Sequence, residues 1–248
     1  MRHTLEEIKL KSGARGLLID VPDASVMSFQ FHFRAGSRLT KNNEIYETAH
    51  IMEHMAFGAN AKFKDEHAFE ADFTKNGAYH NASTSDQSME YIASCADFEW
   101  DRILDLQQVS ITSPRFNETE LAAEKGNVKS ELTGYLNNYN RVLWPRIQQI
   151  SGEDTLTYLQ RLKTINNVTL ADIREHHRRT HTSGNMRFVI AGKLTGRKSQ
   201  IKRMLESWEL NDGQRLDPPK DPYNEIIKPS LIRRKEAPNR TIRWTNCI

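Results

Sequence analysis

Three residues in the stretch 47–60, ETAHIMEHMAFGAN, have the types and spacing of a metal site. His50, Glu53 and His54 follow the order H-x-x-E-H. On a helix, residues four apart share a face, so both imidazoles can reach one ion while Glu53 lies beside it. Two neutral imidazoles leave a tetrahedral zinc ion in need of a third protein ligand and an open position for water. An uncoordinated Glu53 can then accept a proton from zinc-bound water, whose pKa the metal lowers.

The alternative is an ordinary surface helix with scattered polar residues. The neighbours of the motif argue against it, because they are apolar all round the helix: Ile51, Met52, Met55, Ala56 and Phe57. A buried helix seldom carries two histidines and a glutamate unless something satisfies their polar atoms. The sequence therefore favours a metal site on a buried helix.

A third ligand is expected on a later helix, predicted to span residues 118–136. Glu124 and Glu131 are seven residues apart and so lie nearly on one face of this helix. Apolar residues share that face: Leu121, Val128 and Leu132. Carboxylates on a core-facing stripe need partners, and we interpret Glu131 as a zinc ligand and Glu124 as the acceptor that fixes a histidine tautomer. Ordinary salt bridges at the helix edge are the alternative.

The remaining pattern predicts a mixed α+β domain. Alternation and a turn at Ser12-Gly13 predict an N-terminal hairpin, and a clean alternating strand follows at residues 26–33. Strands 78–85 and 88–95 flank a tight turn, and a buried strand begins at Met186. Helices are predicted at 47–58, 66–76 (ending at Gly77), 98–110, 118–136 (opened by a capping box of Asn117 and Glu120), 139–150, from the N-cap Thr169, and at 196–207.

Composition and charge exclude several classes of protein. The 248 residues are 38% hydrophobic, enough for a full core, and 35 basic residues barely exceed 32 acidic ones. We therefore expect no nucleic-acid partner, and we expect the short run Arg178-Arg179 to be solvated. Cys95 and Cys247 lie in predicted strands with no second pair nearby, so no disulfide framework or Cys-type zinc knuckle is expected. No apolar run approaches a membrane span and no targeting segment is visible, so a cytoplasmic location is expected.

The pattern divides the chain at about residue 212. Residues 1–212 are predicted to form one domain, and residues 213–248 a linker and the start of a further strand. Five of the eight prolines fall after residue 217, which is typical of a linker or irregular wrap. The last residues, TIRWTNCI, then resume a strand pattern. This pattern indicates that a further domain begins there or that a partner completes the sheet.

Taken together, these residues resemble the inverzincin metallopeptidases, the M16 family of pitrilysin, insulin-degrading enzyme and mitochondrial processing peptidase. The H-x-x-E-H motif is followed by a glutamate 77 positions after the second histidine, with another glutamate seven before it. Four segments carry the resemblance, in order along residues 5–210: AGSRLTKNNEIYETAHIMEHMAFGAN, NGAYHNASTS, EKGNVKSEL and SGNMRFVIAG.

The resemblance implies a zinc endopeptidase that cleaves peptides or unfolded segments, with a mostly antiparallel sheet packed against helices. It implies that His50, His54 and Glu131 bind zinc, that Glu53 is the general base and that Glu124 supports the site. It also implies a strand edge to which an extended peptide adds as a strand. The residues of that edge are Asn81, Ala82, Ser83, Thr84 and Ser85. A plain polar edge strand is the alternative.

Other histidines are not expected to bind the metal. We expect His80 to be a packing or surface residue, and His176 and His177 to be solvated on a late helix.

Members of the family generally pair this catalytic domain with a second one of similar fold, and only one domain is predicted here. Two hypotheses follow. The chain is the catalytic half of a zinc endopeptidase, or it is a zinc- and peptide-binding assembly subunit with no turnover of its own. The intact Glu53 favours the first hypothesis, and the missing half favours the second for the isolated chain.

Overall fold

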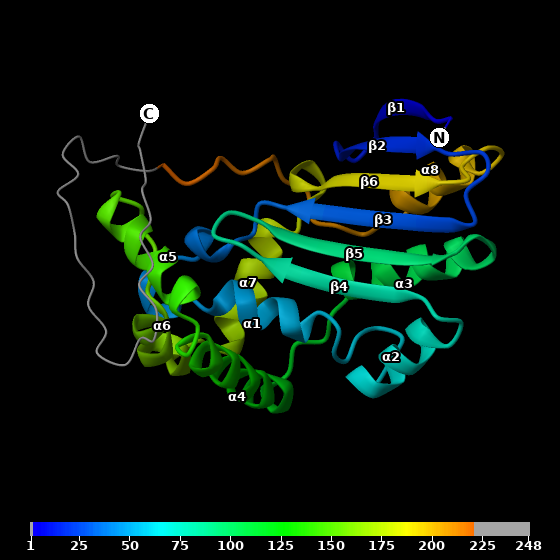
Figure 1. Cartoon of the computed structure of the whole chain (residues 1–248). Helices are drawn as coiled ribbons and strands as arrows, with labels where there is room; N and C mark the ends of the chain where they lie inside the picture. The colour runs from blue at the N-terminus through cyan, green and yellow to red at the C-terminus, as the bar shows by residue number, and fades with distance from the viewer. Residues whose placement is uncertain (1, 221–248) are drawn as a thin grey trace.

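A computed structural model describes residues 2–220 of the chain (Figure 1). Six strands form a single sheet in the order β1-β2-β6-β3-β5-β4. Their bounds are β1 Thr4–Lys9, β2 Arg15–Asp20, β3 Val26–Phe33, β4 Tyr79–Thr84, β5 Met89–Ala96 and β6 Arg187–Gly192. Neighbouring strands are antiparallel except β2 and β6, which are parallel. The predicted α+β class with a mostly antiparallel sheet is confirmed.

Eight α-helices lie among the described residues. They are α1 Thr48–Met55, α2 Glu66–Thr74, α3 Trp100–Thr112, α4 Glu118–Tyr135, α5 Tyr139–Ile150, α6 Tyr158–Thr164, α7 Leu170–Thr180 and α8 Lys198–Glu206. All except α6 were predicted within a few residues. Gly77, expected to end the second helix in a left-handed conformation, has φ +81°. None of these helices is long and apolar enough to cross a membrane.

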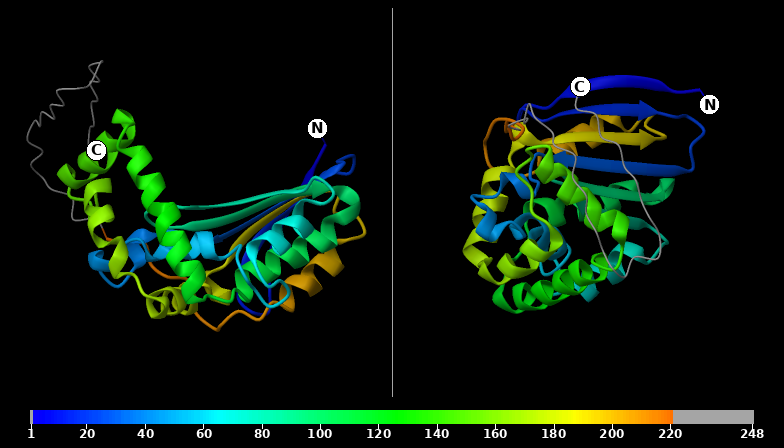
Figure 2. Two further views of the ribbon diagram at one scale, coloured as in Figure 1. Left: turned by 90° about the horizontal axis from the view of Figure 1, so that it is seen from below. Right: turned by 60° about the vertical axis from the view of Figure 1, so that its left-hand side comes forward.

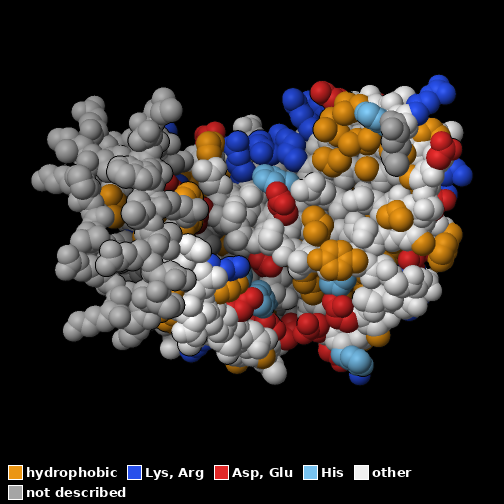
Figure 3. Space-filling model, in the orientation of Figure 1, with side chains coloured by type: hydrophobic (Ala, Val, Ile, Leu, Met, Phe, Trp, Pro, Cys, Tyr) orange, Lys and Arg blue, Asp and Glu red, His pale blue; other side chains and the backbone are white. Residues whose placement is uncertain are grey.

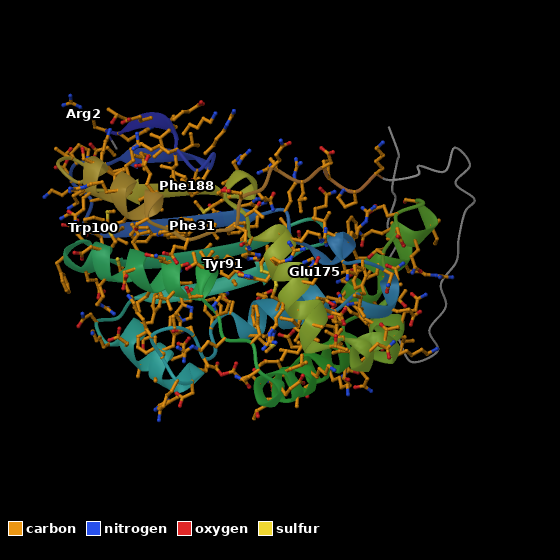
Figure 4. The ribbon with its side chains drawn as sticks, turned by 180° about the vertical axis from the view of Figure 1, so that it is seen from behind. Arg2, Phe31, Tyr91, Trp100, Glu175 and Phe188 are labelled. Carbon is orange, nitrogen blue, oxygen red and sulfur yellow. The ribbon has the colours of Figure 1, made fainter. Side chains whose placement is uncertain are left out.

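The sheet has one covered face and one open face. Helices α3, α7 and α8 lie behind it, while its other face carries no helix within residues 2–220 (Figures 1 and 2). Alternate residues of β3 point into the covered side, where Phe29, Phe31 and Phe33 are fully buried. Figure 4 shows the covered side, with Phe31, Phe188 and Tyr91 of three neighbouring strands between the sheet and the helices. Helices α4 and α5 rise at one end, beside the open face (Figure 2, left).

Two predictions about α7 are wrong. His176 is 3% exposed and its Nε2 donates to the Ala35 carbonyl at 2.9 Å, and His177 Nε2 donates to the Ile111 carbonyl at 2.9 Å. Burial lowers the pKa of His176 to about 4, so this imidazole is neutral. The histidines are therefore packing residues that satisfy loop and helix-end carbonyls, and are not solvated.

The tail remains attached to the domain somewhat beyond the predicted boundary at residue 212. Gly184 N–H donates to the Gly213 carbonyl at 3.0 Å, and Leu216 N–H donates to Asn185 Oδ1 at 3.4 Å. The strand predicted for the C-terminal residues, with Cys247, lies outside the described residues. Cys95 lies in β5, a strand that was predicted, and it is buried and free among the described residues.

Candidate metal centre

Two helices present the predicted site residues to each other. The apolar side of α1 is fully buried at Ile51 and Met52, so its histidines lie on the side that meets α4. Helix α4 packs through Val128 and Leu132, which are both fully buried. Packing of these two stripes therefore places the carboxylates of α4 beside the imidazoles of α1.

The structure brings together the three predicted zinc ligands. His50, His54 and Glu131 each offer one ligand atom, and these atoms lie within 4.8 Å of one another. His50 Nε2 is 3.3 Å from Glu131 Oε2, and the two imidazole rings are 5.0 Å apart, nearly perpendicular. Two imidazoles and one carboxylate with an open side match the donor set of a catalytic zinc site. The residues present therefore fit the metal.

The second nitrogen of each imidazole is already held by a carboxylate. His54 Nδ1 donates to Glu124 Oε2 at 2.9 Å, as predicted for the supporting glutamate. His50 Nδ1 donates to Glu47 Oε2 at 3.1 Å. These bonds orient both rings with Nε2 toward the centre, where an ion would replace the contact between His50 Nε2 and Glu131.

Glu47 is a site residue that the sequence analysis missed. Its side chain is fully buried and accepts hydrogen bonds from the Arg161 guanidinium, including one from Nη2 at 3.0 Å. Arg161 lies on α6, the helix that was not predicted. A glutamate three residues before the first histidine is a usable signal for such a contact, since it shares a helix face with it.

The pKa values of the residues at this centre are shifted by the charges around them. Burial alone would raise the pKa of Glu47, but Arg161 and His50 outweigh it and lower the pKa to about 2. Burial opposes a charge on His50, yet its bonds to Glu131 and Glu47 raise its pKa to about 9. Hydrogen bonds from His50 and His54 lower the pKa values of Glu131 and Glu124. The centre is therefore built to hold positive charge.

Glu53 lies beside the centre and outside the ligand group. Its carboxylate forms no side-chain hydrogen bond or ion pair with the residues that the structure describes. Burial raises the pKa of the Tyr91 phenol, and the nearby charge of Glu53 raises it further. A half-buried, uncommitted carboxylate one residue before a ligand is suited to accept a proton at the site.

The predicted peptide-binding segment forms the edge of the sheet. Asn81 to Thr84 belong to β4, which pairs only with β5 in the described sheet and contacts α1. Ala82 N–H is bonded at 2.9 Å by the side chain of the preceding residue, Asn81. Ser85 lies beyond the strand, with its N–H bonded to Ser88 O and its carbonyl bonded by Ser37 N–H. Four of the five predicted residues therefore lie on the edge strand, and the Ala82 N–H has to leave the Asn81 side chain before it can bond an added strand.

His80 packs away from the centre, as expected of a packing histidine. Its ring packs at a tilt among phenylalanines, with its centroid 4.2 Å from that of Phe73 and 4.6 Å from that of Phe57, and its Nε2 donates to Glu70 at 2.6 Å.

Sequence comparison identifies the class of protein that this fold and centre define. Residues 17–157 match the sequence model of Insulinase (Peptidase family M16), so the chain belongs to peptidase family M16. The chain is 26% identical over 184 residues to the mitochondrial-processing peptidase subunit beta of Caenorhabditis elegans, covering 72% of this chain and 39% of that protein. It is 29% identical over 137 residues to an insulin-degrading enzyme homolog of Dictyostelium discoideum, covering 55% of this chain and 14% of that protein.

Solved structures show the same fold. A protease from Helicobacter pylori superposes with a TM-score of 0.76 at 20% identity, over 89% of this chain and 54% of that one. The inactive domain of a peptidase M16 from Pseudomonas fluorescens superposes with a TM-score of 0.75 at 17% identity, over 86% of this chain and 52% of that one. The chain thus spans about half the length of these structures and less than half of the relatives it matches.

Proposed function

We propose that this chain is the catalytic part of a zinc-dependent endopeptidase. The observation that carries the proposal is the arrangement of the two imidazoles. Glu47 and Glu124 hold their Nδ1 atoms, while ligand atoms of His50, His54 and Glu131 converge within 4.8 Å. Simple salt-bridged histidines do not require this double orientation. Membership of a peptidase family supports the same reading.

Each residue has a separate role in the proposed reaction. His50, His54 and Glu131 would hold the ion, which supplies Lewis acidity that polarises a peptide carbonyl and makes a water more acidic. Glu53 accepts the proton of the attacking water and passes it to the leaving amine. Glu124 keeps His54 in its orientation.

The substrate is proposed to be a peptide or an unfolded segment in extended form. The edge of β4 offers main-chain groups beside α1, so a peptide that adds there as a strand would run past the centre. Recognition through main-chain groups would accept many sequences, which suits an endopeptidase.

The second candidate is a zinc- and peptide-binding assembly subunit with no turnover of its own. A structure of similar fold that is described as the inactive domain of a peptidase M16 favours it. The same site would bind metal and peptide under this hypothesis. The two candidates differ in whether Glu53 acts as a general base.

Metal content tests the centre. We expect about one zinc ion per chain, lost in His50→Ala and His54→Ala and bound more weakly in Glu131→Gln.

Glu53→Gln should retain zinc but reduce peptide turnover by a factor on the order of 10². Elemental analysis and a quenched-fluorescent peptide assay measure the two quantities. Stoichiometric zinc in the His50/His54 double variant would refute the centre, and a wild-type chain with zinc but no turnover in any assembly would favour the binding subunit.

A further inference from the structure

The open face of the sheet carries a charged row that crosses all six strands. The registers pair Lys9 with Arg15, Arg15 with Arg187, Arg187 with His32, His32 with Glu90, and Glu90 with Ser83. Directly paired residues point to the same face of a sheet, so the six side chains form one ladder from β1 to β4. The basic members occupy the β1, β2 and β6 side of this ladder, and its acidic member lies on β5, next to β4.

Two more guanidiniums lie near Arg187, the member of the ladder on β6. Arg34 follows β3, and Arg215 lies in the segment after α8. Burial, followed by the charges of Arg15 and Arg34, lowers the pKa of Arg187. Burial and the charges of Arg187 and Arg34 likewise lower the pKa of Arg215. Arg187 therefore lies near the other three arginines, and the space-filling view shows basic side chains gathered on the open face (Figure 3).

This basic cluster (Lys9, Arg15, Arg34, Arg187 and Arg215) lacks acidic partners within the described residues. None of its members forms an ion pair among residues 2–220. Arg215 Nη1 is buried there without a hydrogen-bond partner. Two acids lie nearby: Glu90 is engaged by Gln30 Nε2 at 3.3 Å, and Glu7, which is paired with Leu17, lines the hollow without an ion pair to the cluster. Like charges held together without counter-charge are costly, which is a common property of anion-binding sites.

Three residues of the cluster, Lys9, Arg15 and Arg187, line a hollow with an apolar floor. Its volume is about 610 Å³, and its lining includes Arg15, Arg187 and His32 together with Leu17 and Val189. Leu17 and Val189 are paired across β2 and β6, one row along the open face from the arginine pair. A ligand that fits both parts has an anionic group and an apolar group a few ångströms apart. An acidic residue next to an apolar residue in a peptide has this form, whereas a bare phosphate lacks the apolar part.

We propose that this hollow binds a carboxylate of an extended peptide on Arg15 and Arg187, with the neighbouring apolar side chain on Leu17 and Val189. The inference rests on the proposed function, since the peptide is the proposed substrate. The two strands of the hollow, β6 and β2, are three and four strands from β4, or about 14 to 19 Å, a distance that about four to six extended residues span. It therefore selects a substrate residue remote from the bond that is cleaved.

The charge of the chain's own C-terminal segment does not suit the hollow. Residues 221–248 contain six basic and three acidic residues, so their net charge has the same sign as the basic cluster. Charge complementarity instead favours an acidic ligand from another molecule.

Binding of matched peptides to the full chain tests the proposal. The probes are three fluorescent extended peptides of one sequence, with Glu-Leu, Gln-Leu or Lys-Leu at one position and an amidated C-terminus. We expect the Glu peptide to bind at least about tenfold more tightly than the Gln peptide, because charge-assisted bonds to guanidinium are the stronger kind. A fourth probe, the Gln peptide with a free C-terminus, shows whether a terminal carboxylate serves as well as a side chain.

Variants then locate the preference. Arg15 is exposed, so Arg15→Gln should leave the fold intact and weaken the preference for the Glu peptide. The double variant Arg15→Gln/Arg187→Gln should abolish this preference. Lys202→Gln/Arg203→Gln on α8, behind the sheet, makes the same change in net charge and should leave the preference intact. Arg187 also donates to the Gly184 carbonyl, so its substitution can affect folding, and thermal unfolding of each variant is recorded. If the double variant misfolds, the Arg15→Gln single variant alone decides the test.

Three results would overturn the inference: equal binding of the Glu and Gln peptides, a preference that survives in the folded arginine variants, or tighter binding of a single-stranded oligonucleotide lost in the same variants. Cleavage of the peptides is measured separately. Cleavage without charge preference would leave the proposed function standing and remove this subsite, and charge preference without cleavage would do the reverse.

Discussion

At the residue scale, Glu47 connects a candidate metal ligand to a buried cation. Its carboxylate is fully buried and is shared between His50 Nδ1 and the Arg161 guanidinium. Both contacts favour the ionised form, so the buried charge is balanced on two sides. The imidazole is thereby held with Nε2 toward the centre, a role that a neutral side chain would fill poorly.

We predict that Glu47→Gln weakens zinc binding by about 10- to 100-fold, as loss of a carboxylate behind a metal-binding histidine typically does. The same change leaves Arg161 buried without its charge partner, at a cost of about 3 to 5 kcal/mol in unfolding free energy. Chelator competition measures the first quantity, and urea unfolding of the zinc-free chain measures the second.

The double variant Glu47→Gln/Arg161→Met separates the two effects. Removing the cation together with its partner should recover most of the lost stability while zinc binding stays weak. Zinc affinity that returns with stability would mean that Glu47 acts only through the fold, and unchanged affinity in both variants would contradict any role at the centre.

His176 makes stability depend on pH by a different route. Its pKa falls to about 4 in the folded chain from an ordinary value near 6.5, chiefly because it is buried. The unfolded chain therefore binds more protons between these values, so stability is fully present above pH 6.5 and is lost as pH falls toward 4. His177 and His181 are lowered in the same direction and add to the slope.

We predict that His176→Gln lowers stability at pH 7.5, by losing the bond to the Ala35 carbonyl, but flattens the decline between pH 6.5 and 4. Urea unfolding at several pH values measures both. His67→Gln, at an exposed position, is the control and should change neither. A decline as steep in His176→Gln as in the wild type would show that this imidazole does not titrate in that range.

At the element scale, α1 and α4 could be predicted because each combines an apolar face with chemistry at fixed spacing. Helix α6 was missed because it has only seven residues, YLQRLKT, and no clear apolar stripe. A signal was nevertheless present, since Thr157 and Gln160 form a reciprocal capping box. Missing α6 also hid Arg161, whose contact with Glu47 spans 114 positions and follows from no local pattern.

The start of α4 differs in part from the predicted capping box. Asn117 Oδ1 accepts from Glu120 N–H at 2.9 Å, as predicted, but the Glu120 carboxylate turns away and accepts from Ala59 N–H at 2.8 Å. The tertiary bond takes the place of the local one, because it satisfies the main chain just after α1. Glu120 therefore ties the end of one site helix to the beginning of the other.

We predict that Asn117→Ala destabilises the chain by about 1 kcal/mol, the usual cost of losing a helix N-cap. Zinc affinity should change little, because Glu124 and Glu131 lie two and four turns further along a helix fixed by Val128 and Leu132. Asn117→Asp keeps the acceptor and is the matched control, expected to unfold like the wild type. A large loss of zinc affinity in Asn117→Ala would show that the cap itself positions the ligands.

At the scale of the whole molecule, the open face could not be predicted. Its charged row draws one residue from each of six strands, and the pairing of Arg15 with Arg187 joins positions 172 residues apart in sequence. With only three more basic than acidic residues overall, composition gave no sign of a basic cluster. Strand order decides which residues meet, and strand order depends on tertiary packing that periodicity does not encode.

The last prediction concerns the activity of the chain on its own. The proposed ligands, base and edge strand all lie within residues 50–131, so the chain should bind zinc and hold a peptide without help. Hydrolysis also needs the developing oxyanion stabilised in a site shielded from water, and losing such stabilisation costs about 3 to 4 kcal/mol, or 10² to 10³ in rate. Here Glu131 is 42% exposed, and no element of residues 2–220 covers the open face.

We therefore predict that a second domain of similar fold, supplied as a downstream half or a companion chain, raises peptide cleavage by about 100-fold without changing zinc content. Cleavage of a quenched-fluorescent peptide is measured with the chain alone, the second domain alone and the two mixed. Glu53→Gln in the mixture is the control and should remain inactive, since burial of the site cannot replace the base. Full activity from the chain alone would contradict the prediction and would mean that the groups that stabilise the oxyanion lie within these 248 residues.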